Sequence, residues 1–216
     1  MYLLRRNALL YAIYWAVMFT VLMVFMGSFD VFGPWILETG RASAWSLTVD
    51  TAPGWFMFVM GIISAVMHLP VAVAHGVTRR EFTIGAGVFA VATAVLFQLM
   101  KTVGTLLEAM VYGSRGLMDQ LTEPYPWPTM SGALVDMGKG LAFMLSGWLV
   151  ALVFYRLKIW WALLLSPFAT IPVSAGTGMA YTPWDMHWAF ITAMLAAAAL
   201  AGYLTAGGLA VKPKKA

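Results

Sequence analysis

The chain has 216 residues, of which 62% are hydrophobic and 10% are charged, and its formal net charge is +4 at pH 7. A typical soluble domain is only about 45–50% apolar and about 25% charged, and one soluble core of this size cannot bury so much apolar surface. These values exclude an ordinary soluble fold and predict an all-α integral membrane protein, with residues 1–216 forming a single transmembrane domain.

Six apolar segments without any Asp, Glu, Lys or Arg are candidates for transmembrane helices, since about 20 helical residues cross a bilayer core about 30 Å thick. The predicted spans are 8–27, 55–74, 83–100, 140–155, 159–175 and 188–211. The fourth and fifth are short, so we expect them to recruit flanking residues or to tilt differently.

The charged residues indicate how these spans are oriented. Nine of the thirteen basic residues lie in one alternating set of short segments, and eight of the nine acidic residues lie in the other set. The basic set comprises 1–7, 75–82, 156–158 and 212–216. Because basic residues near span ends stay in the cytoplasm, the sequence predicts six transmembrane helices with both termini cytoplasmic.

Several polar or helix-breaking residues lie inside the predicted spans. Pro70 in the second span, and Pro167 and Pro172 in the fifth, each lack an N–H and are expected to kink their helices. Broken membrane helices often mark moving parts or substrate paths, although a static bend is an equally good interpretation. His68 is six residues from the inner end of its span, about 9 Å deep. It is either a functional ionisable group or a neutral imidazole bonded to a carbonyl freed by Pro70.

The inner loop between the second and third spans, 75–82, has the sequence HGVTRREF. Gly76 can end the second helix in a left-handed cap. Thr78 can cap the third helix, and Glu81 follows at the spacing of a T-x-x-E capping box. Two arginines lie in the first turn after the cap, Arg79 and Arg80. The pattern therefore predicts a stiff cytoplasmic elbow, whereas charge that only sets topology would need the arginines but not the caps.

The outer segment 101–139 is expected to be partly ordered, as a continuation of the third helix followed by a proline-stiffened cap. Gln98, Lys101 and Glu108 lie at the outer end of the third span. Lys101 and Glu108 are two helical turns apart and can pair, but side chains that simply reach the aqueous interface explain them as well.

Residues 70–82, PVAVAHGVTRREF, resemble the segment that joins spans two and three in ABC-2-type permease subunits of bacterial ABC transporters. The matching residues are Gly76, Val77, Thr78, Arg79, Arg80 and Phe82, with Glu81 at the variable position. The six-span layout, the inside termini and the short 156–158 loop are also similar to that family. In the family this elbow is the coupling helix, which docks into a cleft on a separate ATPase subunit.

The resemblance implies a permease subunit of an ATP-driven exporter in the bacterial cytoplasmic membrane. Its partners would be a cytoplasmic ATPase subunit that binds ATP and Mg, and a second permease copy or paralogue. Spans without fixed charge favour lipid-like, peptide or antibiotic cargo over a small, highly charged substrate. No nucleic-acid partner is expected.

Two other classes of function remain as alternatives. One is a non-energised accessory or assembly subunit of a membrane complex. The other is an intramembrane enzyme, which the residue types disfavour. The chain has no cysteine, no P-loop motif and no cofactor motif, and its three histidines have no ligand-type spacing. We therefore expect no catalytic residue, no metal site and no cofactor in this chain.

Overall fold

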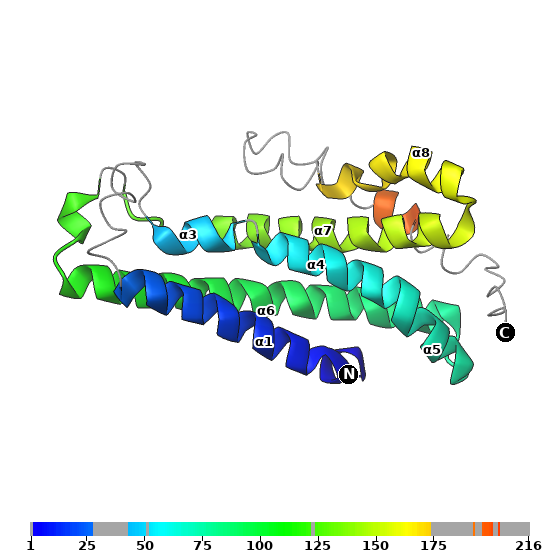
Figure 1. Cartoon of the computed structure of the whole chain (residues 1–216), viewed down its shortest axis with the longest axis horizontal. Helices are drawn as coiled ribbons and strands as arrows, with labels where there is room; N and C mark the ends of the chain where they lie inside the picture. The colour runs from blue at the N-terminus through cyan, green and yellow to red at the C-terminus, as the bar shows by residue number, and fades with distance from the viewer. Residues whose placement is uncertain are drawn as a thin grey trace. The chain divides into compact units, whose positions relative to one another are not determined.

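The computed structural model describes residues 2–27, 43–50, 52–121, 124–173, 192, 196–200 and 203. In this part of the chain the structure is helical, with turns and short connections (Figure 1). The elements in order are α1 (Tyr2–Gly27), α3 (Ala44–Val49), α4 (Ala52–Ile63), the π-helical segment η1 (Ser64–His68), α5 (Leu69–Ala74), α6 (Arg79–Ser114), the 3₁₀ turn η2 (Met118–Gln120), α7 (Met130–Arg156) and α8 (Ile159–Ala169).

In the described part of the chain three helices are long and apolar enough to cross a membrane, which indicates a multi-pass membrane protein. They are Ala52–Ala74, Arg79–Ser114 and Met130–Tyr155, and they contain the second, third and fourth predicted spans. Two shorter apolar helices, Asn7–Val21 and Ile159–Val173, correspond to the first and fifth predicted spans. Most of the sixth predicted span, 188–211, lies outside the described residues.

The third predicted span, 83–100, is much shorter than the helix that contains it. α6 has 36 residues, which corresponds to a length of about 54 Å. This exceeds the bilayer core thickness of about 30 Å, so part of α6 must extend beyond the hydrocarbon. The expectation that segment 101–139 begins as a continuation of this helix is confirmed.

The fourth predicted span, 140–155, lies within α7, which begins at Met130, so the expectation that this short span recruits flanking residues is confirmed. Thr129 caps this helix, since its Oγ1 accepts a hydrogen bond at 3.1 Å from the backbone N–H three residues further on. Two charged residues, Asp136 and Lys139, are 3.6 Å apart inside the first turns. Charged side chains near the end of a membrane helix can pair with each other or reach water, so the helix continues through these positions.

The fifth predicted span, 159–175, is described as far as residue 173, where it is helical except for a turn at Thr170. Pro167 lies inside α8, which ends at Ala169, and Thr170 is its C-terminal cap residue. Pro172 has no N–H to donate to the carbonyl four residues earlier, so the α-helical ladder cannot continue through it. Pro167 therefore lies within α8, and Pro172 follows the turn at Thr170 where α8 ends.

The chain divides into two compact units. The first comprises Met1–Pro53 and Val95–Leu134, and the second comprises Gly54–Ala94 and Val135–Ala216. In the first unit, α1 packs against α6 through the ring of Phe97, which meets three aromatic rings. These are Tyr11 at 5.9 Å, Tyr14 at 5.3 Å and Trp15 at 5.0 Å between centroids.

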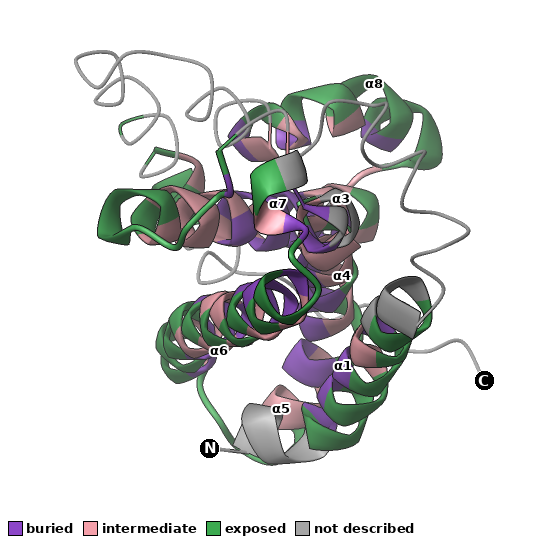
Figure 2. Cartoon of the chain, turned by 90° about the vertical axis from the view of Figure 1, so that its left-hand side faces the viewer, coloured by how far each residue is buried: buried purple, intermediate pink, exposed green. Residues whose placement is uncertain are grey.

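In the second unit, two glycines bring α4 and α7 into backbone contact. A Cβ at Gly61 would overlap the Met144 carbonyl of α7, and a Cβ at Gly147 would overlap the Phe58 carbonyl of α4. Small residues permit this close approach between membrane helices. Figure 2 shows that buried residues lie along one side of most helices, whereas α8 is largely exposed. The α4–α7 crossing therefore forms the centre of this unit.

Candidate functional site

The end of α5 forms the first half of the elbow, which we define as residues 75–82. Gly76 has φ +83°, in the left-handed region that favours glycine. The Gly76 N–H donates to Val73 O at 3.0 Å, and the Val77 N–H donates to Ala72 O at 3.1 Å. This pair of bonds is a Schellman motif, which satisfies the last carbonyls of a helix. The predicted left-handed cap is confirmed.

The start of α6 forms the second half of the elbow. The Thr78 N–H donates to Glu81 Oε2 at 2.9 Å, and the Glu81 N–H donates to Thr78 Oγ1 at 3.2 Å. The Thr78 hydroxyl also donates to the same carboxylate oxygen at 2.7 Å. These reciprocal bonds are the predicted capping box. Only four residues, 75–78, separate the ends of α5 and α6, and both ends are capped, so the elbow has little torsional freedom.

The predicted coupling residues lie together but face in two directions. Phe82 is buried and its ring meets the Trp148 indole of α7 edge-on, at 6.3 Å and 84°. Arg79 is half-buried, and the other members are exposed, namely Gly76, Val77, Thr78, Arg80 and Glu81. The elbow therefore presents basic and apolar groups to its surroundings, while Phe82 attaches it to the core of the second unit.

The second span contains a local departure from the α-helix just before Pro70. The proline ring would clash with the carbonyl four residues earlier, and here Ser64–His68 are π-helical, with the N–H of Leu69 donating to Ser64 O. The disturbance expected near Pro70 therefore takes the form of a π-turn in the hydrogen-bond pattern, a feature frequent at functional sites. His68 lies in this segment and is buried, with 4% of its surface exposed.

The predicted in-membrane polar and proline residues lie on different elements of the structure. His68 and Pro70 lie in η1 and α5 of the second unit, whereas Gln98 lies in the first unit. The Gln98 amide is 3.5 Å from the Thr102 hydroxyl one turn along α6. Two further candidates belong to α8 and the residues that follow it, Pro167 and Pro172. The elbow residues, by contrast, are consecutive in sequence, with Phe82 buried and the rest half-buried or exposed.

Glu108 is at the centre of a buried polar cluster that we name the Glu108 cluster. Its side chain is fully buried in the first unit. Glu108 Oε2 accepts hydrogen bonds from the Ser43 hydroxyl at 2.5 Å and from the Tyr125 hydroxyl at 2.8 Å. Glu108 Oε1 accepts a hydrogen bond from the backbone N–H of Trp45 at 2.9 Å. Burial, and then the nearby Glu108 charge, raise the pKa of Tyr125 well above its ordinary value, so the phenol keeps its proton.

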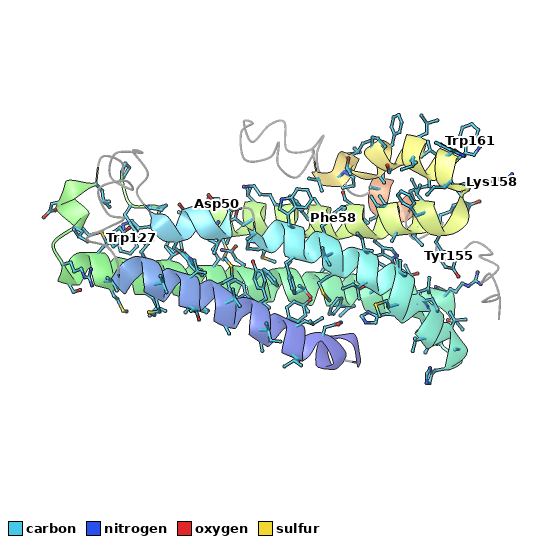
Figure 3. All side chains as sticks on the ribbon, in the orientation of Figure 1. Asp50, Phe58, Trp127, Tyr155, Lys158 and Trp161 are labelled. Carbon is cyan, nitrogen blue, oxygen red and sulfur yellow. The ribbon has the colours of Figure 1, made fainter. Side chains whose placement is uncertain are left out.

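The sequence leaves two alternatives for Lys101 and Glu108, pairing with each other or reaching the aqueous interface, and the structure gives each residue other partners. Lys101 Nζ is 3.2 Å from Asp50, which is labelled in Figure 3 just after α3. The Lys101 carbonyl accepts from Trp45 Nε1 at 3.0 Å, and the Trp45 ring covers Gly104, where a Cβ would overlap it. Sequence reasoning missed this cluster. The sequence feature that points to this cluster is the position of Glu108 inside a long apolar helix, because a buried carboxylate needs hydrogen-bond donors around it.

The cluster joins three segments: α6, the residues from 43 to 50, and the loop at Tyr125. Its hydrogen bonds link these segments to one another, so we interpret it as a structural cluster that holds them together. Within the described residues, no three or more His, Asp or Glu side chains gather as a metal site.

Comparison with protein-family models, curated proteins and solved structures gives no match to this chain.

Proposed function

We propose that this chain is the membrane-spanning permease subunit of an ATP-driven ABC exporter, and that a separate ATPase subunit docks on the elbow, residues 75–82. In this proposal the chain spans the bacterial cytoplasmic membrane six times with both termini inside. A second permease copy or a paralogue completes the translocation path. The partner ATPase binds ATP and Mg, and this chain contributes no catalytic residue.

The observation that carries the proposal is that the elbow is capped on both sides. A flexible loop cannot transmit a push, because its torsions absorb the displacement. The Schellman motif at Gly76 and the capping box between Thr78 and Glu81 remove most of this freedom. Phe82 then packs on Trp148. A force applied to the elbow therefore reaches α5, α6 and α7, which is what a coupling element requires.

The exposed groups define the chemistry of the docking surface. Val77 is 38% exposed at the tip, and Arg80 is exposed one residue beyond the half-buried Arg79. A partner cleft with an apolar floor and acidic rim complements this arrangement. Charge complementarity of this kind sets specificity and association rate.

The test is co-purification from native membranes with an Arg79→Glu/Arg80→Glu variant. A paired charge at a docked interface costs about 2–5 kcal/mol when lost, which weakens binding by at least about 30-fold. Wild-type protein should recover a nucleotide-binding ATPase and the variant should not. A Lys212→Glu/Lys214→Glu variant makes the same charge change in the same predicted cytoplasmic set, and should recover the ATPase normally.

Equal recovery with both variants would mean that the arginines only set topology. Recovery of a stable complex without any ATPase would support an accessory or assembly subunit instead. In each case, normal membrane insertion of the variants must be checked first.

A further inference from the structure

The second unit contains an apolar groove of about 600 Å³, bounded by α7, by α8 with the residues after it, and by residues 196–200. Six of its lining residues are Leu149, Leu152, Val153, Phe168, Ala169 and Ile171. All twelve residues that line it are apolar. The volume is within the range of small-molecule sites, about 300–1,000 Å³.

The groove has a buried floor and an open rim. Leu149, Leu152 and Ala169 are at most 6% exposed, whereas Phe168 is 65% and Ile171 49% exposed. Water in such a groove finds no polar partner. A flexible hydrocarbon chain can enter from the rim and lie on the leucines of the floor.

One end of the groove carries the residue types found at a membrane surface. Leu157 lines the groove, and the next residue, Lys158, is the exposed cap residue of α8. Trp160 and Trp161 follow, at 80% and 59% exposed. Figure 3 labels Lys158 and Trp161 at this end of α8. Tryptophan and lysine are typical of the headgroup layer.

The charge at this end is positive. The sequence contains no Asp or Glu from residue 137 to residue 184, so no carboxylate of this stretch competes for Lys158. The loop 156–158 is predicted to be cytoplasmic, and the cytoplasmic leaflet is where anionic lipids concentrate.

We propose that the groove holds one acyl chain of an anionic phospholipid of the surrounding membrane, with the lipid phosphate against the Lys158 ammonium. The apolar lining accounts for the acyl chain, and the exposed lysine and tryptophans account for the headgroup. This inference uses the membrane location of the chain and the predicted cytoplasmic side of loop 156–158, and it does not depend on an ATPase partner.

The test uses the full chain in phosphatidylcholine nanodiscs that contain a trace of phosphatidylglycerol with a photoreactive diazirine at the end of one acyl chain. Adducts should map to 149–172 more strongly than to the exposed face of α6 around Val88, which does not line the groove. Ile171→Trp should fill the mouth and remove most of these adducts, while Val88→Trp, on a comparably exposed residue, should not.

The headgroup is tested with Lys158→Gln. Each basic residue near an anionic surface contributes enough that its loss lowers the phosphatidylglycerol adduct yield about fivefold. The same diazirine in a phosphatidylcholine probe should label wild-type protein weakly, and the variant should not change that yield. Adducts spread evenly between α8 and α6, or equal labelling of wild-type protein by both probes, would overturn the proposal. Neither result depends on a variant folding.

Discussion

Glu108→Ala is expected to loosen the two segments that are hydrogen-bonded to Glu108, residues 43–50 and 124–129. The substitution removes the carboxylate that accepts from the Trp45 N–H and from the hydroxyls of Ser43 and Tyr125. Each buried donor left unpaired costs about 1–3 kcal/mol. The Tyr125 hydroxyl still has the Thr105 carbonyl as an acceptor at 2.8 Å, so two donors lose their partner, and we expect a total loss of about 3 kcal/mol, within the range of about 2–6 kcal/mol for two such donors.

Glu108→Gln is the matched variant, because it preserves the shape of the side chain. Its carbonyl oxygen can still accept from the Trp45 N–H. Its NH₂ group can donate to the two hydroxyl oxygens, and the Tyr125 hydroxyl keeps the Thr105 carbonyl, at 2.8 Å, as an acceptor. We expect a loss of only about 1 kcal/mol.

The assay is amide hydrogen exchange of the protein in nanodiscs, read at residues 43–50 and 124–129. Exchange in both segments should accelerate strongly in Glu108→Ala and weakly in Glu108→Gln. Asp50→Ala, which removes the exposed ion pair with Lys101, should cost less than about 1 kcal/mol. Unchanged exchange in Glu108→Ala would refute the reasoning, because it would show that the carboxylate does not hold these segments.

Three further predictions follow from single residues. A cysteine at Ser114 should react with an impermeant thiol reagent in intact cells, and one at Thr78 should not; the reverse pattern would contradict the orientation. Gly61→Ala should destabilise the protein by about 1–3 kcal/mol in denaturant titrations, because its Cβ meets α7 backbone, while Gly87→Ala meets nothing and should be neutral or stabilising. Gly76→Val should cost about 1–2 kcal/mol, seen as faster exchange at the end of α5, because a β-branched residue resists φ +83°.

Both caps of the elbow could be predicted from the sequence because they are local. Thr78 and Glu81 are three residues apart, and a short-range rule relates them. The same holds for Gly76, whose cap involves residues no more than five positions away. Such features need no knowledge of tertiary contacts.

The Glu108 cluster could not be predicted, because its partners are distant in sequence. Ser43 and Trp45 precede Glu108 by 65 and 63 residues, and one sequence offers no rule that joins them. The bounds of the predicted spans differ from the ends of α6 and α7 for another reason. Apolar segments mark the hydrocarbon core, but α6 and α7 extend beyond it, where charged side chains are solvated and do not break a helix.

The π-turn before Pro70 could be predicted only in part from the sequence. The proline predicts a disturbance of the second span, since its ring excludes the carbonyl four residues earlier. Whether the helix bends or widens depends on how its neighbours pack. Here Gly61 lies against the α7 backbone just before the π-helical segment, Ser64–His68, and no single residue of the sequence predicts that combination.

The central claim is that the elbow contacts a nucleotide-binding ATPase, and site-directed cross-linking tests it most directly. The chain has no cysteine, so a single cysteine at the exposed Val77 can carry a short photoreactive cross-linker in native membranes. The account predicts a cross-linked ATPase, identified by mass spectrometry, whose yield changes when ATP is added. The same cross-linker at Ser114 should give no ATPase adduct. An abundant, correctly inserted Val77→Cys protein that cross-links only to lipid, or to a protein without a nucleotide site, would contradict the account.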